Sequence, residues 1–152
     1  MEARGDEYVL ELYHKNLKTT PWKRTSDRTK SYNCIAWALG HSDRRWDPFP
    51  KGTDYWPRGL DSKNTVAVWV KLFQKFRYRR CANGNYQPGY EKVAIYVADD
   101  EPQHVARLIG ENLWTSKLGE LHDIEHTLGG LDDERYGKPI VFMRRILKRK
   151  VR

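Results

Sequence analysis

The sequence predicts an α+β domain in which N-terminal helices pack on a small antiparallel sheet. Apolar residues recur with the helical period in the first half of the chain, whereas alternating, β-branched runs follow residue 90. The 152 residues contain no internal repeat and no low-complexity linker. We therefore expect a single domain over residues 1–147, followed by a basic tail at 148–152.

The first predicted helix covers residues 6–16. Its apolar residues recur at helical spacing: Tyr8, Val9, Leu12 and Tyr13. Residues 17–30 are mostly polar and contain Pro21, so they predict a loop. The next helix is short. Ser31 is a suitable N-cap, the following residues are largely apolar, and Gly40 is a suitable stop, which places Cys34 in the first turn.

Residues 41–61 predict a long irregular segment, because Pro48, Pro50 and Pro57 interrupt it. Its aromatic content, which includes Trp46, Tyr55 and Trp56, is too high for a solvated linker and is typical of a segment that covers or walls a site. An amphipathic helix follows, capped by Asn64, and one face carries Val66, Trp69, Val70, Phe73 and Phe76.

The second half predicts the sheet. After a loop over residues 79–90 come four runs with strand character, at 92–98, 104–109, 113–116 and 139–147. Gly110, Glu111 and Asn112 form a tight hairpin connection between the second and third of these strands.

The net charge of +8 and the pI of about 9.5 favour a polyanionic contact through basic patches. No nucleic-acid-binding motif accompanies this charge, so we expect no specific nucleic-acid partner. No apolar run is long enough to span a membrane, and the N-terminus has no apolar core of a secretory signal. Two cysteines are too few for a disulfide scaffold. We expect a cytoplasmic protein without a cofactor, with signal-independent export as the alternative.

Cys34 is the leading candidate for a nucleophile. A thiol in the first turn of a helix lies near the positive end of the helix dipole and near unpaired N–H groups, which favour the thiolate. The structural alternative is that Cys34 packs as a small hydrophobic residue. Cys81, in a polar loop, has no predicted role.

His104 starts a predicted strand and is the candidate base for Cys34. His104 and Leu108 share one strand face, so the imidazole points toward an apolar layer. The hairpin spacing places Ser116 or Lys117 beside His104. Ser116 is the better partner for the second ring nitrogen, because a lysine would disfavour the imidazolium.

Three segments carry a resemblance to known families: Tyr-Asn-Cys-Ile-Ala-Trp-Ala-Leu-Gly at 32–40, Pro-Gly-Tyr-Glu-Lys-Val-Ala-Ile-Tyr at 88–96, and His-Val-Ala-Arg at 104–107 with Trp-Thr-Ser-Lys-Leu-Gly-Glu at 114–120. The order of a helical cysteine, a strand-starting histidine and a polar residue twelve positions later resembles the papain-like fold, most of all the NlpC-type cell-wall peptidases and amidases. Over residues 25–145 the chain also resembles an uncharacterised family of small bacterial proteins.

The resemblance implies that Cys34 is the nucleophile, His104 the general base and Ser116 the third member. Asn33 stands where the NlpC-type group usually has Asp, and Ser116 stands where relatives have His or Asn. The oxyanion hole would use the backbone N–H of Cys34 with Asn33 or Tyr32.

In this hypothesis Trp46, Tyr55 and Trp56 wall the substrate and Lys117 contacts it. The implied activity is hydrolysis or transfer at an amide or isopeptide bond in peptidoglycan peptide or a protein side chain. The alternative is an inactive papain-like module that binds an acidic peptide or protein.

Residues 122–126 also fit the His-x-x-Glu-His pattern of one class of zinc peptidases. That pattern needs a helix, and nearby glycines leave room for about two turns only. A polar surface helix without metal is the favoured interpretation. A second option is that Glu120, Asp123 or His126 folds over the cleft.

Overall fold

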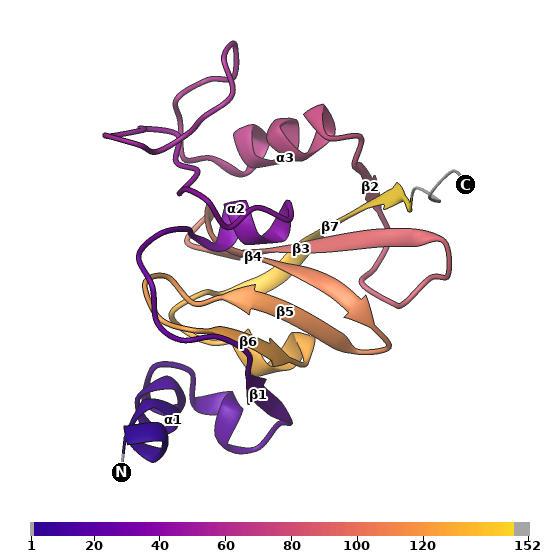
Figure 1. Cartoon of the computed structure of the whole chain (residues 1–152). Helices are drawn as coiled ribbons and strands as arrows, with labels where there is room; N and C mark the ends of the chain where they lie inside the picture. Colours follow the sequence, from indigo (N-terminus) through magenta and orange to yellow (C-terminus); the bar gives the residue numbers. More distant parts are fainter. Residues whose placement is uncertain (1, 148–152) are drawn as a thin grey trace, which may run out of the picture.

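The computed structural model describes residues 2–147 and shows an α+β fold built around one seven-stranded antiparallel sheet. Its strand order is β1-β6-β5-β4-β3-β7-β2. The strands are β1 (Trp22–Arg24), β2 (Arg79–Cys81), β3 (Tyr90–Ala98), β4 (Glu101–Gly110), β5 (Leu113–Lys117), β6 (Asp123–His126) and β7 (Lys138–Ile146). Helical elements cover both faces of this sheet (Figure 1). The predicted basic tail at 148–152 lies outside the described residues.

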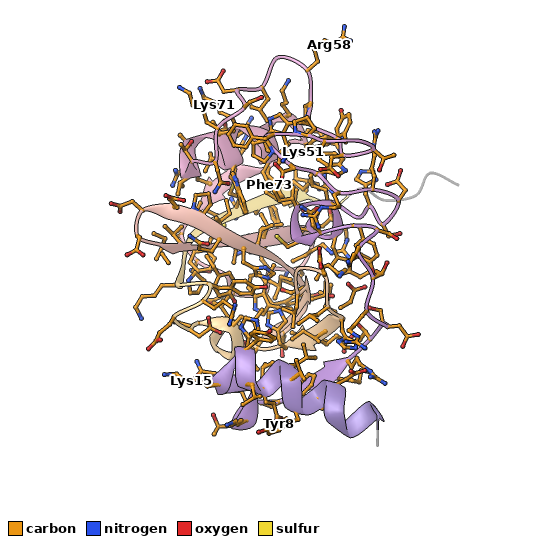
Figure 2. All side chains as sticks on the ribbon, turned by 90° about the vertical axis from the view of Figure 1, so that its left-hand side faces the viewer. Tyr8, Lys15, Lys51, Arg58, Lys71 and Phe73 are labelled. Atoms are coloured by element: carbon orange, nitrogen blue, oxygen red, sulfur yellow. The ribbon has the colours of Figure 1, made fainter. Side chains whose placement is uncertain are left out.

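One face of the sheet is covered by α2 (Cys34–Ala38), α3 (Val66–Lys75) and the loop between them. The predicted apolar face of α3 is confirmed, because Trp69, Val70 and Phe73 are buried. In Figure 2 the labelled Phe73 lies in the interior, whereas Lys71 and Arg58 lie at the surface. Trp46 anchors the loop in the core with only 4% of its surface exposed.

The opposite face is covered by α1 (Glu2–Tyr13), η1 (Lys15–Lys18) and η2 (Leu128–Leu131). Leu10, Leu17 and Leu131 pack there against the even-numbered side chains of β3 and β4. The predicted apolar stripe of the first helix is wrong: the side chains of Tyr8 and Leu12 are mostly exposed, and Leu10 is the buried one. The helix also starts and ends earlier than the predicted range of 6–16.

The strand predictions over β3, β4, β5 and β7 are confirmed within a few residues. The predicted hairpin joins β4 to β5, and Asn112 adopts the positive φ of 46° that such a turn requires. Two cap assignments are wrong. Asn33, not Ser31, caps α2, and Thr65, not Asn64, caps α3.

Two further segments differ from their predictions. Residues 79–81, predicted as part of a loop, form the edge strand β2, which pairs with β7. The predicted surface helix at 122–126 is instead the buried strand β6, which pairs with β5 and β1. His122 precedes β6 and His126 ends it, so the two histidines do not share the helix face that the zinc motif requires.

Between residues 2 and 147, no helix combines the length and the apolar character needed to cross a membrane.

Candidate functional site

The start of α2 is held by Asn33. Its side-chain oxygen accepts hydrogen bonds from the backbone N–H groups of Ala36 (3.3 Å) and Trp46 (3.0 Å). Its amide nitrogen donates to the carbonyl of Trp46 at 2.8 Å. One side chain therefore caps the helix and joins it to the long loop, and Cys34 becomes the first helical residue, as predicted.

The sulfur of Cys34 lies against strand β4. The backbone of Val105 favours the thiolate, as do nearby backbone groups and the charge of Arg45. The β4–β5 ladder begins at the pair Arg107 and Thr115, so the part of β4 that precedes Arg107 and contains Val105 is not paired with β5. Burial is the larger effect and raises the pKa of the Cys34 thiol above its usual value. The thiol is therefore neutral at rest, contrary to the predicted low-pKa thiolate.

His104 is buried on the other face of the sheet. Its Nε2 lies 2.9 Å from Ser116 Oγ, so the predicted contact between these two residues is present. The imidazole stacks on the ring of Tyr136, with centroids 4.1 Å apart and planes within 2° of parallel. Burial, together with the neighbouring His126 and His14, holds the pKa of His104 well below its usual value.

Cys34 lies beside the backbone of Val105, and His104 is the residue that precedes Val105 on the strand. The side chains of Cys34 and His104 are nevertheless not joined. Val105 faces the α2 layer, and the adjacent His104 faces the opposite layer, because side chains alternate along a strand. The hydrogen bonds within residues 2–147 include none between Cys34 and His104. The Nδ1 atom of His104 likewise has no hydrogen-bond partner within that range. The free nitrogen and the thiol are thus separated by the edge of β4.

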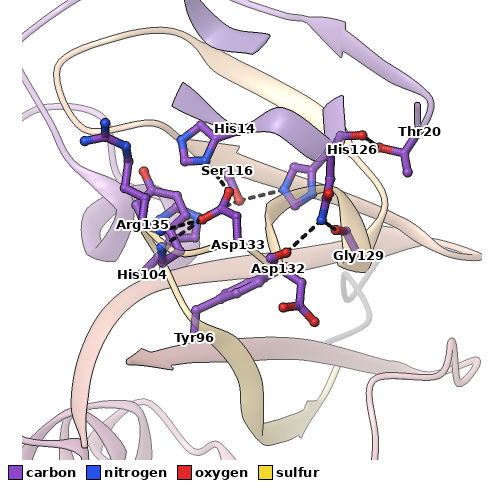
Figure 3. A network of polar contacts seen from close by, with 12 residues as sticks. His14, Thr20, Tyr96, His104, Ser116, His126, Gly129, Asp132, Asp133 and Arg135 are labelled. Atoms are coloured by element: carbon purple, nitrogen blue, oxygen red, sulfur yellow. Dashed lines mark hydrogen bonds and ion pairs between the residues drawn. The ribbon is translucent and has the colours of Figure 1, made fainter. Parts of the chain in front are cut away.

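The sequence analysis missed His14, Asp133 and Tyr136 near His104, and it placed His126 only as a residue that folds over the cleft (Figure 3). His126 Nε2 lies 2.7 Å from Ser116 Oγ, and His14 Nδ1 lies 2.6 Å from Asp133 Oδ2. The ring of Tyr136 lies between His14 and His104. A histidine three residues before the Gly129-Gly130 turn is too weak a signal to reveal this cluster in a single sequence.

Two other predicted site residues have their polar groups occupied. The ammonium group of Lys117 donates to the carbonyls of Thr29, Gly119 and Leu121 at 2.5–2.8 Å, which uses all three of its protons. The predicted substrate contact of Lys117 is therefore wrong, since no donor remains. The hydroxyl of Tyr32 donates to Asp123 at 2.6 Å, and burial raises the pKa of Tyr32 to about 12.

The predicted aromatic wall is divided by the fold. Trp46 belongs to the core, where its ring contacts His41, Tyr55 and Phe76. Tyr55 and Trp56 are only partly buried, so these two rings are the ones that a ligand can reach. Arg44 lies over the ring of Tyr55, 4.1 Å from its centroid.

The described part of the chain, residues 2–147, contains no cluster of three His, Cys, Asp or Glu side chains placed to hold a metal ion.

Fold and site together define an α+β domain with a helix-start cysteine on one side of the sheet and a buried His-Ser-His chain on the other. The family described as a domain of unknown function (DUF7689) matches residues 23–144, and the chain belongs to this family. The matched range includes Cys34, His104, Ser116 and His126 but begins after His14. No curated protein and no solved structure matches the chain.

Proposed function

We propose that this protein is a thiol-dependent hydrolase or acyl transferase on a papain-like frame of the NlpC type, with Cys34 and His104 as its reacting groups. One observation carries the proposal: the thiol of Cys34 lies close enough to the backbone of Val105, the residue next to His104, for that backbone to favour the thiolate. His104 is also held through Nε2 by Ser116, and its Nδ1 has no hydrogen-bond partner within residues 2–147. A base needs such a free ring nitrogen.

The chemistry follows from two neutral groups. In the proposed reaction the Cys34 sulfur attacks an acyl carbonyl while its proton is transferred round the edge of β4 to His104 Nδ1, and the resulting imidazolium then protonates the leaving amine. Water, deprotonated by His104, hydrolyses the thioester and restores the thiol; an acceptor amine in place of water gives transfer. The backbone N–H of Cys34, and the Asn33 amide proton not donated to Trp46, are the candidate oxyanion donors.

The substrate class follows the resemblance to cell-wall peptidases and amidases. An amide or isopeptide bond in peptidoglycan peptide or in a protein side chain fits the proposed reaction. The exposed edges of Tyr55 and Trp56 are the candidate aromatic contacts for such a substrate. A basic chain with a net charge of +8 favours acidic segments around the scissile bond.

A second function, a non-catalytic module that binds an acidic peptide or protein, has an observation of its own. Burial raises the pKa of Cys34 and lowers that of His104, so the resting pair has no thiolate and no imidazolium. A structural role for both side chains would produce this same environment. The two functions differ in whether His104 affects the reactivity of Cys34.

The deciding experiment is the pH dependence of iodoacetamide alkylation in the folded protein, mapped by mass spectrometry. Cys34 and Cys81 are both free thiols, so Cys81 is an internal reference in each sample. Under the hydrolase proposal, alkylation of Cys34 persists well below the free-thiol pKa of about 8.5 although the resting thiol is neutral, because His104 removes its proton as the sulfur reacts. It slows at least about tenfold in His104→Ala, because general-base assistance is worth about 10² or more.

The matched control is His41→Ala, which removes an exposed histidine of the long loop. It should leave the alkylation rate of Cys34 unchanged, and Cys81 should be unaffected in both variants. Circular dichroism checks that each variant is folded. A Cys34 that does not react, or that reacts at the same rate with and without His104, overturns the hydrolase proposal and leaves the binding module.

A further inference from the structure

A chain of three hydrogen bonds runs from a backbone carbonyl to the candidate base, and its members His126, Ser116 and His104 are drawn in Figure 3. His126 Nδ1 lies 2.7 Å from the carbonyl oxygen of Thr127, and His126 Nε2 lies 2.7 Å from Ser116 Oγ. Ser116 Oγ lies in turn 2.9 Å from His104 Nε2. At most 1% of the surface of each of these three side chains is exposed, so water does not compete for the bonds.

The carbonyl at the end of the chain sets the direction of the first two bonds. A carbonyl oxygen only accepts, so Nδ1 of His126 carries a proton and donates it to Thr127. Burial lowers the pKa of His126 to about 4, and the ring is neutral at pH 7. Its Nε2 then has a lone pair only, and Ser116 must donate its hydroxyl proton to that atom.

The same reasoning determines the third bond. The hydroxyl of Ser116 has one proton, which is donated to His126, so toward His104 the oxygen only accepts. Nε2 of His104 therefore carries the proton in that bond. The ring is neutral because it is fully buried, so Nδ1 of His104 has the lone pair.

We propose that His126 is a positioning residue that, through Ser116, fixes His104 in the Nε2–H tautomer and leaves Nδ1 as the proton-accepting atom. The inference rests on the proposed function, in which Nδ1 accepts the proton of Cys34. A serine alone can donate to or accept from an imidazole and so sets no tautomer. His126, anchored on the Thr127 carbonyl, makes Ser116 an acceptor only.

Stacking holds the plane of the same ring. Tyr136 covers one face of His104, and His14, bonded to Asp133, contacts Tyr136 at a centroid distance of 4.6 Å. Tyr96 contacts the ring of His104 as well, at 5.6 Å. Rotation of the ring by 180° about its Cβ–Cγ bond keeps this plane but would break the bond to Ser116, so stacking fixes the plane of the ring and the hydrogen bond fixes which nitrogen faces Ser116.

The test is a long-range ¹H–¹⁵N correlation spectrum of the folded protein labelled with ¹⁵N-histidine, which distinguishes protonated from unprotonated ring nitrogens. We expect opposite tautomers: Nε2–H for His104 and Nδ1–H for His126. Single His→Gln variants assign the signals. A wild-type spectrum with His104 in the Nδ1–H form, or with His104 charged at pH 7, overturns the inference without any variant.

Two substitutions at His126 then separate a positioning role from a merely structural one. His126→Gln keeps an oxygen that accepts from Ser116, so His104 should remain Nε2–H and Cys34 alkylation should stay near the wild-type rate. His126→Phe keeps the size but offers no acceptor, so the tautomer of His104 should become mixed and the alkylation rate should fall about tenfold. His122→Gln, outside the chain of bonds, is the matched control.

The proposed role of His126 and the proposed hydrolase function can fail independently, and the experiments distinguish the two failures. If Cys34 alkylation is indifferent to His104 but the tautomers are as stated, the hydrolase proposal fails and the assigned proton positions stand. If His104 keeps its tautomer in His126→Phe, the positioning role fails whatever the reactivity of Cys34.

Discussion

At the scale of single residues, the most constrained polar group is the ammonium of Lys117. None of its side chain is exposed, and it holds three loop carbonyls together beneath the ring of Tyr32, 5.2 Å from the ring centroid. Its role is to satisfy backbone acceptors that would otherwise be buried without a partner. This explains why a lysine lies inside the domain, on the side of the sheet that faces α2.

We expect Lys117→Met to lower the free energy of unfolding by about 3 kcal/mol or more. Methionine fills the space but leaves three carbonyls without donors, and each unpaired buried group costs about 1–3 kcal/mol. Urea denaturation measures the change. Lys23→Met is the control, because Lys23 is mostly exposed and its ion pair with Glu125 spans 3.7 Å. That change should stay within about 0.5 kcal/mol. A similar loss in both variants would contradict the assigned role of Lys117.

At the scale of elements, the short helix α2 depends on its cap. A helix of this length is unstable alone, so its first turn must be fixed from outside. Asn33 does this by bonding to both Ala36 and Trp46, which couples the Cys34 turn to the long loop. The loop therefore sets the position of the candidate nucleophile.

Asn33→Ala should lower the free energy of unfolding by about 2 kcal/mol, the upper end of the range for the loss of a cap, because the bonds to the loop are lost as well. It should also make Cys34 more accessible to iodoacetamide. Ser31→Ala should change the stability by less than about 0.5 kcal/mol, since Ser31 is exposed and its hydrogen bonds within residues 2–147 go to Thr29. Thermal or urea unfolding of the two variants compares the caps, and a larger loss at Ser31 would contradict the structure.

At the scale of the whole molecule, the buried histidines link stability to pH. The folded pKa of His126 is about 4, below the usual 6.5, because burial disfavours the charged ring. Unfolding exposes this ring and allows it to take up a proton between those two values. The contribution of His126 is therefore fully present above pH 6.5 and is lost as the pH falls toward 4. The buried His104 acts in the same direction.

We expect the free energy of unfolding to fall by about 3 kcal/mol from this residue alone between pH 7 and pH 4. Urea titrations at several pH values measure the slope. In His126→Gln, which does not titrate in this range, the slope should be smaller by that contribution. An unchanged slope in the variant would show that His126 does not titrate as a buried neutral ring.

The sequence predicts the larger elements but not the edges of the sheet. The α3 face and the four longer strands follow from periodicity over four or more residues. The strands β1 and β2 have three residues each, too few for any period to be visible. Strand β6 was missed because Asp123, Glu125 and His126 look solvent-exposed in sequence, and their burial depends on pairing with β5 and β1.

The candidate site, too, could be predicted from the sequence only in part. The first-turn position of Cys34 and the contact between His104 and Ser116 depend on local spacing, and both were predicted. The opposite faces of Cys34 and His104 follow only once α2 is seen to pack on the Val105 side. The raised pKa of Cys34 also required the structure, because the degree of burial outweighs the effect of the helix start. His126 entered the site through a strand that the sequence did not reveal.

The position of β7 has a consequence for how the chain folds. This strand lies between β3 and β2 in the sheet, although it follows both of them in sequence by more than forty residues. Until β7 inserts, β3 has an open edge, with Val93 and Ile95 beside it, that other chains can pair with. Folding must therefore wait for a contact of long sequence separation, which makes it slow. Partly synthesised chains that end before residue 138 would be the form most prone to aggregate.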